Sequence, residues 1–201
     1  MYYKNYDINL DKLLRIDSSN TENTIYFLNE GVKDISINHF EIPIGYRLVK
    51  SLRKDQYRLV TTDKESETVY LVELRFRQDI VYGKTTCTQI NVWRSCLFKH
   101  YDAKRDFPRS IFHHILNDYP IVITLEDQLG INKRFWDIMI SWVFSKNYFI
   151  YLSSRIKDVH SLTTINSLDE LYEKWENYCW GKERDTHTHR LLVISQEKLS
   201  Q

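Results

Sequence analysis

Glycine, proline and cysteine are scarce in this chain. Its 201 residues include 5 Gly, 3 Pro and 3 Cys. So little glycine excludes collagen-like, low-complexity and flexible-linker sequences, and it disfavours a glycine-rich loop for binding phosphate. The cysteines, Cys87, Cys96 and Cys179, are odd in number and form no CxxC pair. We therefore interpret them as reduced, buried or half-buried thiols and not as a disulfide framework.

The chain also lacks a charge excess and a long apolar run. Its 28 Lys and Arg residues nearly balance its 27 Asp and Glu residues, which leaves a net charge of +1. This balance gives no strong signal for a nucleic-acid partner or for a polybasic membrane anchor. No apolar segment approaches the ~18–20 residues that span a membrane, and residues 1–14 show no signal-peptide pattern. We therefore expect no membrane partner and a cytoplasmic location.

Aromatic side chains, in contrast, are plentiful. The chain has 14 Tyr, 9 Phe and 5 Trp, and hydrophobic residues make up 42% of it. This composition argues against disorder and is rich enough to build a large core. The length suits one domain, or one domain with a short appendage. Residues 1–45 form a polar lead-in with weak patterning, for which a short helix or strand is expected, with Asp11–Ile16 as the candidate helix. A domain is expected over residues 46–201, and the lead-in either belongs to it or stands apart from it.

Two kinds of periodicity follow one another after this lead-in. Between residues 46 and 93, β-rich and alternating segments with short connections predict an antiparallel meander with strands at 46–49, 57–61, 69–77 and 85–93. From about residue 106, helical and apolar segments alternate: a helix from 106, a strand at 121–125, a helix at 132–146, a strand at 148–152, a helix opened by Ser167 and Glu170, and a strand at 190–195. The strand–helix–strand connection favours a parallel pair. The fold class is therefore α+β, a mixed and mostly antiparallel central sheet with helices on its faces.

Polar side chains after the buried strand 121–125 are candidates for chemistry. Ligands collect at the carboxyl ends of strands in such folds, so Asp127 would act as a base or hydrogen-bond acceptor and Gln128 would contact a ligand. In the alternative interpretation, Asp127 only caps the turn or helix that follows. Both interpretations fit the sequence.

Two pairs of an arginine and a tryptophan are candidates for ligand binding. Arg134 would bind an anion while Trp136, near the start of its helix, stacks on a planar ligand. Trp93 and Arg94, at the end of a strand, would suit a nucleotide or an anionic acyl carrier. In the alternative interpretation, Trp136 only covers the sheet edge, and Trp93 is a packed side chain beside an exposed Arg94.

Neither a metal site nor a nucleic-acid groove is expected. His113 and His114 are adjacent on a helix and point about 100° apart, and no HExxH motif occurs. A cluster of basic residues lies between positions 47 and 58, but we interpret it as a solvated face because the total charge is neutral.

The element order and two local segments resemble the GCN5-related N-acetyltransferase (GNAT) family, in particular GNAT-like proteins carried by bacteriophages and mobile elements. The segments are Ile123–Gly130 with Lys133–Trp136, and Cys179–Lys182 with Arg190–Ser195. The resemblance covers about residues 46–195. It implies transfer of an acyl group to an amine on a nucleotide, a small molecule or a protein, with acetyl-CoA or another acyl-CoA as donor. It also implies the cytoplasm of a bacterial host as location.

The resemblance assigns roles to further residues, and one segment departs from the family. The coenzyme A pyrophosphate loop would fall on residues 99–108, which contain no glycine. Pro108 removes one N–H donor there, and the carboxylates in this segment would repel phosphate. Lys99 and Arg105 would then bind phosphate through their side chains. Tyr151 or Asp127 would move the proton.

The degenerate loop leaves a second function open. A non-catalytic descendant would keep the fold and act as a binding module or inhibitor on a host protein. The absent glycine loop favours this alternative, whereas the polar and aromatic residues Asp127, Gln128, Arg134 and Trp136 favour a ligand site.

Overall fold

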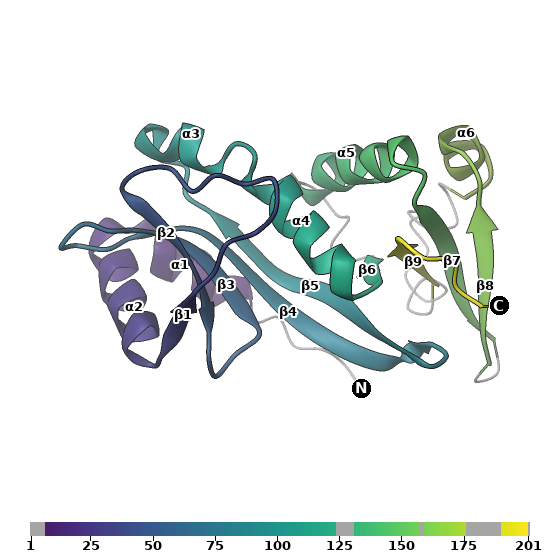
Figure 1. Ribbon diagram of the computed structural model, residues 1–201, viewed down its shortest axis with the longest axis horizontal. Helices are drawn as coiled ribbons and strands as arrows, with labels where there is room; N and C mark the ends of the chain where they lie inside the picture. The colour runs from purple at the N-terminus through teal and green to yellow at the C-terminus, as the bar shows by residue number, and fades with distance from the viewer. Residues whose placement is uncertain (1–6, 124–130, 157–158, 176–189, 201) are drawn as a thin grey trace. The chain divides into compact units, whose positions relative to one another are not determined.

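The computed structural model describes residues 7–123, 131–156, 159–175 and 190–200, and it is α+β with a large, mostly antiparallel sheet (Figure 1). The chain divides into two compact units. The first comprises residues 1–74 and 90–112, and the second comprises residues 75–89 and 113–201. Strands β4 (Thr68–Val81) and β5 (Lys84–Arg94) run through both units.

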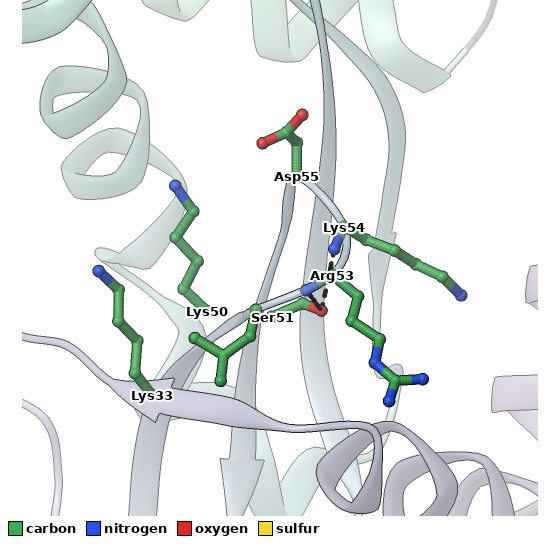
Figure 2. A pocket seen from close by; sticks show the side chains of 7 residues that line it. Lys33, Lys50, Ser51, Arg53, Lys54 and Asp55 are labelled. Carbon is green, nitrogen blue, oxygen red and sulfur yellow. Dashed lines mark hydrogen bonds between the residues drawn. The ribbon is translucent and has the colours of Figure 1, made fainter.

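The first unit combines an antiparallel sheet with short helices. Its order is β1–β2–β3–β4–β5. Besides β4 and β5, its elements are α1 (Asp7–Arg15), α2 (Asp17–Asn29), β1 (Val32–Asp34), β2 (Tyr46–Ser51), β3 (Gln56–Thr61), η1 (Phe98–His100), α3 (Tyr101–Lys104) and the start of α4 (Phe107–Asp118). Ser51 closes the β2–β3 turn, because its Oγ accepts hydrogen bonds from the N–H groups of Arg53 and Lys54, both at 3.1 Å (Figure 2).

Both faces of this first sheet are covered by apolar side chains. On one face, Phe27 of α2 packs against Val49 and Val60. On the other, the Phe107 ring meets the Tyr70 ring edge-on, with 5.0 Å between centroids. Tyr70 of β4 is the register partner of Leu59, the neighbour of Val60 in β3, so it lies on the face opposite to Val60. Burying each large apolar side chain stabilises the fold by about 1.5–3 kcal/mol.

The sequence predicted the strands of this unit better than its helices. The four strands of the meander are confirmed, with β4 longer than expected and the β4–β5 turn reduced to Tyr82 and Gly83. The lead-in, in contrast, holds two helices and a strand, more than the short helix or strand that was expected. The buried face of α2 consists of Asn20, Thr24 and Phe27. Two of these residues are polar, so hydrophobic periodicity does not reveal the helix.

The second unit adds strands beyond β5 in the order β5–β6–β9–β7–β8. Its further elements are the rest of α4, β6 (Ile121–Ile123), α5 (Ile131–Ser145), β7 (Phe149–Ile156), β8 (Val159–Ile165), α6 (Leu168–Glu170), the π-helical turn η3 (Leu171–Trp175) and β9 (Arg190–Ser195). β5 and β6 are parallel, with Cys87 opposite Ile121, which confirms the expected crossover. β9 pairs antiparallel with both β6 and β7.

An apolar cluster forms the centre of the second unit. It contains Ile80, Val81, Val122, Tyr151, Val193 and Leu199. Half of the expected capping box is confirmed, since the Glu170 N–H donates to Ser167 Oγ at 3.0 Å, while the Glu170 carboxylate accepts the N–H of Asn166, one residue before the cap, at 2.9 Å. The sequence did not predict β8, whose residues VHSLTTI are half polar and which pairs with β7 at the end of the strand order. Among the described residues of the whole chain, no helix has the length and apolar character needed to cross a membrane.

Candidate functional site

Three residues far apart in the sequence meet at one end of the first unit's sheet. Tyr46 begins β2, Glu67 precedes β4, and His100 ends η1. Thr61 is the register partner of Tyr46, and it also exchanges hydrogen bonds with Glu67. Its N–H donates to the Glu67 carbonyl oxygen at 3.0 Å, and its Oγ1 accepts from the Glu67 N–H at 2.9 Å. Two hairpin registers therefore place Tyr46 and Glu67 side by side.

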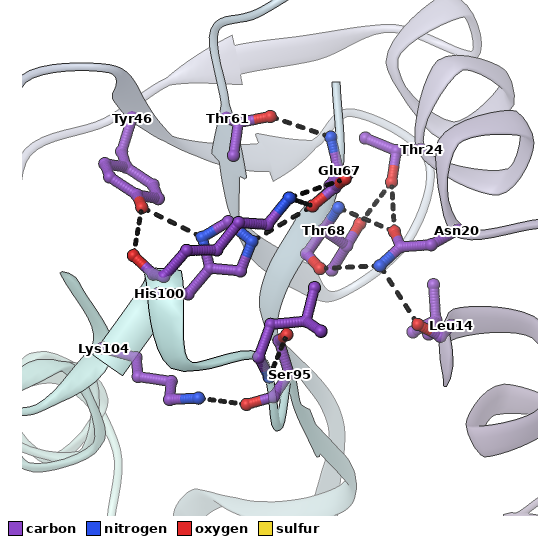
Figure 3. Close-up of polar contacts among 12 residues, drawn as sticks. Leu14, Asn20, Thr24, Tyr46, Thr61, Glu67, Thr68, Ser95, His100 and Lys104 are labelled. Atoms are coloured by element: carbon purple, nitrogen blue, oxygen red, sulfur yellow. Dashed lines mark hydrogen bonds and ion pairs between the residues drawn. The ribbon is translucent and has the colours of Figure 1, made fainter. Parts of the chain in front are cut away.

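The three side chains form a continuous hydrogen-bonded line (Figure 3). The Tyr46 hydroxyl lies 2.9 Å from His100 Nδ1, and His100 Nε2 lies 3.0 Å from Glu67 Oε2. Lys99 Nζ also binds this carboxylate, at 3.0 Å from Oε2. His100 is 3% exposed and the Glu67 side chain 14%, whereas Tyr46 is only half-buried. We call Tyr46, His100 and Glu67 the relay.

The charges around the relay determine where its protons lie. Burial alone raises the pKa of Glu67, but hydrogen bonds from Lys99 and His100 outweigh burial and hold that pKa below 4.5. Burial lowers the pKa of His100 below 6.5, against the hydrogen bond with Glu67. At neutral pH, Glu67 is therefore an ionised acceptor and His100 a neutral imidazole. His100 Nε2–H then donates to Glu67, and the Tyr46 O–H donates to Nδ1.

This arrangement can move a proton in both directions. Tyr46 stays protonated at neutral pH, because burial raises its pKa above 10. A substrate that gives a proton to the Tyr46 oxygen can displace the phenolic proton onto His100 Nδ1. The resulting imidazolium is stabilised by the Glu67 carboxylate, as in any base held by an acidic orienting group.

A buried polar network holds Thr68, the residue that follows Glu67. Asn20 Nδ2 donates to the Thr68 carbonyl oxygen at 3.0 Å, and Asn20 Oδ1 accepts the Thr68 N–H at 2.8 Å. Arg58 Nη1 donates to Thr68 Oγ1 at 3.1 Å, while its guanidinium lies 3.9 Å from the centroid of the Phe27 ring. Burial lowers the pKa of Arg58 to about 10, so it is still charged at neutral pH. The backbone that carries Glu67 is thus fixed on both sides.

The segment predicted to bind phosphate already uses its cations within the chain. Lys99 binds Glu67, and Lys104 Nζ donates to the Ser95 carbonyl oxygen. Arg105 contacts Asp106 at 3.6 Å and, more distantly, Asp102 at 4.0 Å.

Trp93 and Arg94 lie on opposite sides of β5. Trp93 is 8% exposed and packs with Leu14 and Leu71, whereas Arg94 is exposed. Of the residues that the sequence nominated in the first unit, Lys99 contacts the relay, through Glu67.

The nominated residues of the second unit lie in its core or outside the described residues. Tyr151 is 1% exposed, and its hydroxyl accepts the Leu199 N–H at 2.9 Å. Trp136 is 3% exposed and meets the Phe135 ring edge-on. Asp127 and Gln128 lie outside the described residues, and Arg134 lies in α5, with its side chain also outside the description.

Sequence analysis did not nominate any member of the relay. The three residues are separated by 21 and 33 positions, so no local motif joins them. The signal that could have found them is the register of two hairpins, which sets Tyr46 and Glu67 at the same end of the sheet.

Neither a metal centre nor a known relative helps to interpret the relay. The described residues hold no group of three or more His, Cys, Asp and Glu side chains placed to bind a metal ion. No family model, curated protein or solved structure matches the chain. The interpretation of the site therefore depends on its own geometry.

Proposed function

We propose that this chain catalyses the transfer of an activated acyl group to an amine, with the relay moving the proton. The observation that carries the proposal is the line from Tyr46 through His100 to Glu67, with heavy-atom distances of 2.9 and 3.0 Å. Acyl transfer needs a group that first takes a proton from the attacking nitrogen and then gives one to the leaving group. A neutral histidine behind a tyrosine hydroxyl does both.

The proposed reaction balances within the relay. The amine nitrogen attacks the acyl carbon, a C–N bond forms, and the nitrogen gives one proton to the Tyr46 oxygen. The Tyr46 proton passes to His100 Nδ1, and Glu67 stabilises the imidazolium. The bond to the leaving oxygen or sulfur then breaks, and the proton returns from Nδ1 through Tyr46 to that atom. The products are an amide and a free alcohol or thiol, and the relay ends as it began.

The choice of acyl transfer draws support from the GNAT resemblance, from the α+β fold and from the parallel β5–β6 pair. The residues at 99–108 do not fit a coenzyme A pyrophosphate held by backbone N–H groups. They contain no glycine, and Lys99, Lys104 and Arg105 are already engaged within the chain. We therefore derive no step through coenzyme A and propose a donor recognised by its acyl group.

The test compares two tyrosines that each contact a histidine. The full chain is incubated with acetyl-CoA or p-nitrophenyl acetate and with lysine, an aminonucleoside or a lysine peptide as acceptor. Acylated amine is measured by mass spectrometry. Tyr46→Phe should lower the rate about 10²- to 10⁴-fold, the usual contribution of a positioned proton donor. Tyr148→Phe, which alters the Tyr148–His113 contact of the second unit, is the matched control and should retain the rate within about twofold.

Two results would overturn this function. One is a wild-type rate with every donor and acceptor equal to that without protein. The other is a Tyr46→Phe rate equal to wild type. A true relay also gives a rate that falls as the pH drops through the lowered pKa of His100, because His100 must be neutral to accept the proton.

A second candidate function is favoured by the aromatic surface beside the relay. Phe98 is 90% exposed and Tyr101 56%, and their rings are nearly parallel, with centroids 6.4 Å apart. Exposed aromatic rings are typical of protein-binding surfaces. In this alternative the chain is a non-catalytic module that binds a host protein, and the relay only fixes η1 to the sheet. Phe98→Ala would then abolish partner binding, whereas Tyr46→Phe would leave it intact.

A further inference from the structure

A hollow beside the edge of the first unit's sheet is separate from the relay residues. It has a volume of about 310 Å³, and its lining comes from β1, the end of β2 and the β2–β3 turn. The lining residues are Lys33, Lys50, Ser51, Leu52, Arg53, Lys54 and Asp55 (Figure 2). Four of these seven carry a positive charge and one a negative charge.

Two of the cations are held together by the sheet itself. Lys33 is the register partner of Lys50 across the antiparallel β1–β2 pair, so both side chains leave the same face. Figure 2 shows them extending to the same side. Lys50 Nζ lies 5.1 Å from the centroid of the Tyr57 ring, and neither ammonium forms an ion pair with a described carboxylate. Like charges directly opposite one another destabilise a sheet unless an anion offsets them.

The other two cations share one carboxylate. Glu30 lies 3.9 Å from Arg53 Nη1 and 3.7 Å from Lys54 Nζ. One negative charge thus faces two positive charges at distances near the limit of an ion pair. The hollow therefore has a net positive charge even when Glu30 is counted with its lining residues.

Ser51 fixes the turn that completes the lining. It is 5% exposed, and its Oγ accepts the N–H groups of Arg53 and Lys54. Because Ser51 follows Lys50 in β2, its side chain leaves the face opposite to the two lysines, so they are the groups of this pair of strands that face an anion in the hollow.

We propose that this hollow binds the phosphoryl group of a small molecule, with Lys33 and Lys50 as its ligands. A dianion offsets both unpaired lysines at once, which a single carboxylate cannot do. The neutral total charge of the chain favours a discrete ligand over a nucleic-acid backbone, which needs a long basic track. The proposal is independent of the relay, because no residue that lines the hollow belongs to the relay.

The experiment titrates the full chain with inorganic phosphate and with pyrophosphate at constant ionic strength, using chloride as the monovalent control. Binding is followed by calorimetry and by the thermal unfolding midpoint. The double variant Lys33→Gln/Lys50→Gln should bind at least about tenfold more weakly, because each charged hydrogen bond is worth several-fold in affinity. Lys12→Gln/Lys64→Gln, at two exposed lysines of the same unit, is the matched control and should bind like wild type.

The midpoints separate loss of binding from loss of folding. Without phosphate, the Lys33→Gln/Lys50→Gln variant should unfold at or slightly above the wild-type midpoint, because the repulsion between the lysines is gone. Phosphate should then raise the midpoint of wild type and of the control but not of this variant.

Three outcomes would overturn the proposal. The first is a phosphate effect no larger than that of chloride at equal ionic strength, and the second is equal phosphate binding by the double variant. In the third, an oligonucleotide binds while phosphate and pyrophosphate do not, which would make the surface a polyanion track.

Discussion

Each unit of this chain contains a tyrosine in contact with a histidine, and the two pairs differ in their surroundings. In the first unit, the Tyr46 hydroxyl lies 2.9 Å from His100 Nδ1, and the other ring nitrogen faces Glu67. In the second unit, the Tyr148 hydroxyl lies 3.3 Å from His113 Nε2. There, the Trp142 ring meets the His113 ring edge-on, and the Tyr148 ring is nearly parallel to it.

The comparison shows what turns a tyrosine–histidine contact into a candidate for proton transfer. A carboxylate on the second nitrogen fixes the tautomer and stabilises the imidazolium that forms when the ring accepts a proton. The contacts of His113 with the rings of Trp142 and Tyr148 are suited to packing α4 against α5 and the residue before β7. We therefore expect the same substitution to have different consequences in the two units.

The largest difference is expected when each imidazole is removed. His100→Ala should lower the free energy of unfolding by about 2–4 kcal/mol, because it opens a cavity and leaves two polar side chains without their partner. His113→Ala, at a half-buried site, should lower it by about 1 kcal/mol. Urea unfolding followed by circular dichroism measures both. Equal losses of unfolding free energy in the two variants would mean that the relay stabilises the fold no more than the contacts of His113 with Trp142 and Tyr148 do.

The next prediction concerns how the stability of the chain changes as the pH falls. His100 and Glu67 both have lowered pKa values, so each binds fewer protons in the folded chain than in the unfolded chain. Their contribution to stability is therefore complete above pH 6.5. It falls as the pH drops through the folded pKa of His100, and falls again below pH 4.5 through that of Glu67. Urea midpoints measured from pH 7.5 to 4 test this, and a midpoint that rises on acidification would contradict it.

The substitution Glu67→Gln tests how much the Glu67 carboxylate contributes to the pKa of His100. The hydrogen bond with Glu67 raises the pKa of His100 against the effect of burial. Glu67→Gln should therefore lower the His100 pKa further, as followed in histidine ring resonances by NMR. Glu65→Gln changes an exposed carboxylate of the same turn and should leave the His100 titration in place. An upward shift in Glu67→Gln would show that Glu67 does not accept from His100.

The sequence predicted the elements that repeat a simple period, and it predicted few of the contacts between them. The alternating residues of β4 predicted a strand and the helical stripe of α5 predicted a helix, and both elements are present, although residues 68–72 of β4 are buried on both faces. The helix α2 was not predicted because Asn20 and Thr24 fill its buried face. Its stability depends on hydrogen bonds to Thr68, 48 and 44 residues away.

The same limit applies to the candidate site. Lys99 was nominated for its charge, but its neighbour His100 was not, since the value of that histidine depends on residues brought in by β2 and β4. Tyr151 was nominated from the family resemblance, and the sequence does not show that its hydroxyl meets the Leu199 N–H across the core. Polar contacts between distant strands depend on register, and register follows from the whole sheet.

The smallest effect is expected at Lys99, on the exposed side of the relay. Its side chain is 58% exposed, so the ion pair with Glu67 should contribute less than about 1 kcal/mol to stability. Its charge nevertheless acts on both neighbours, because it lowers the pKa of Glu67 and that of His100. Lys99→Gln should therefore raise the His100 pKa, opposite to the effect of Glu67→Gln, with almost no change in the urea midpoint.

Lys146→Gln, at an exposed lysine two residues before Tyr148, is the control and should leave the His100 pKa unchanged. Opposite shifts of the His100 pKa in Glu67→Gln and Lys99→Gln would show that His100 responds to both neighbouring charges. Shifts in the same direction would mean that these substitutions act by loosening the fold and not through the charges of the relay.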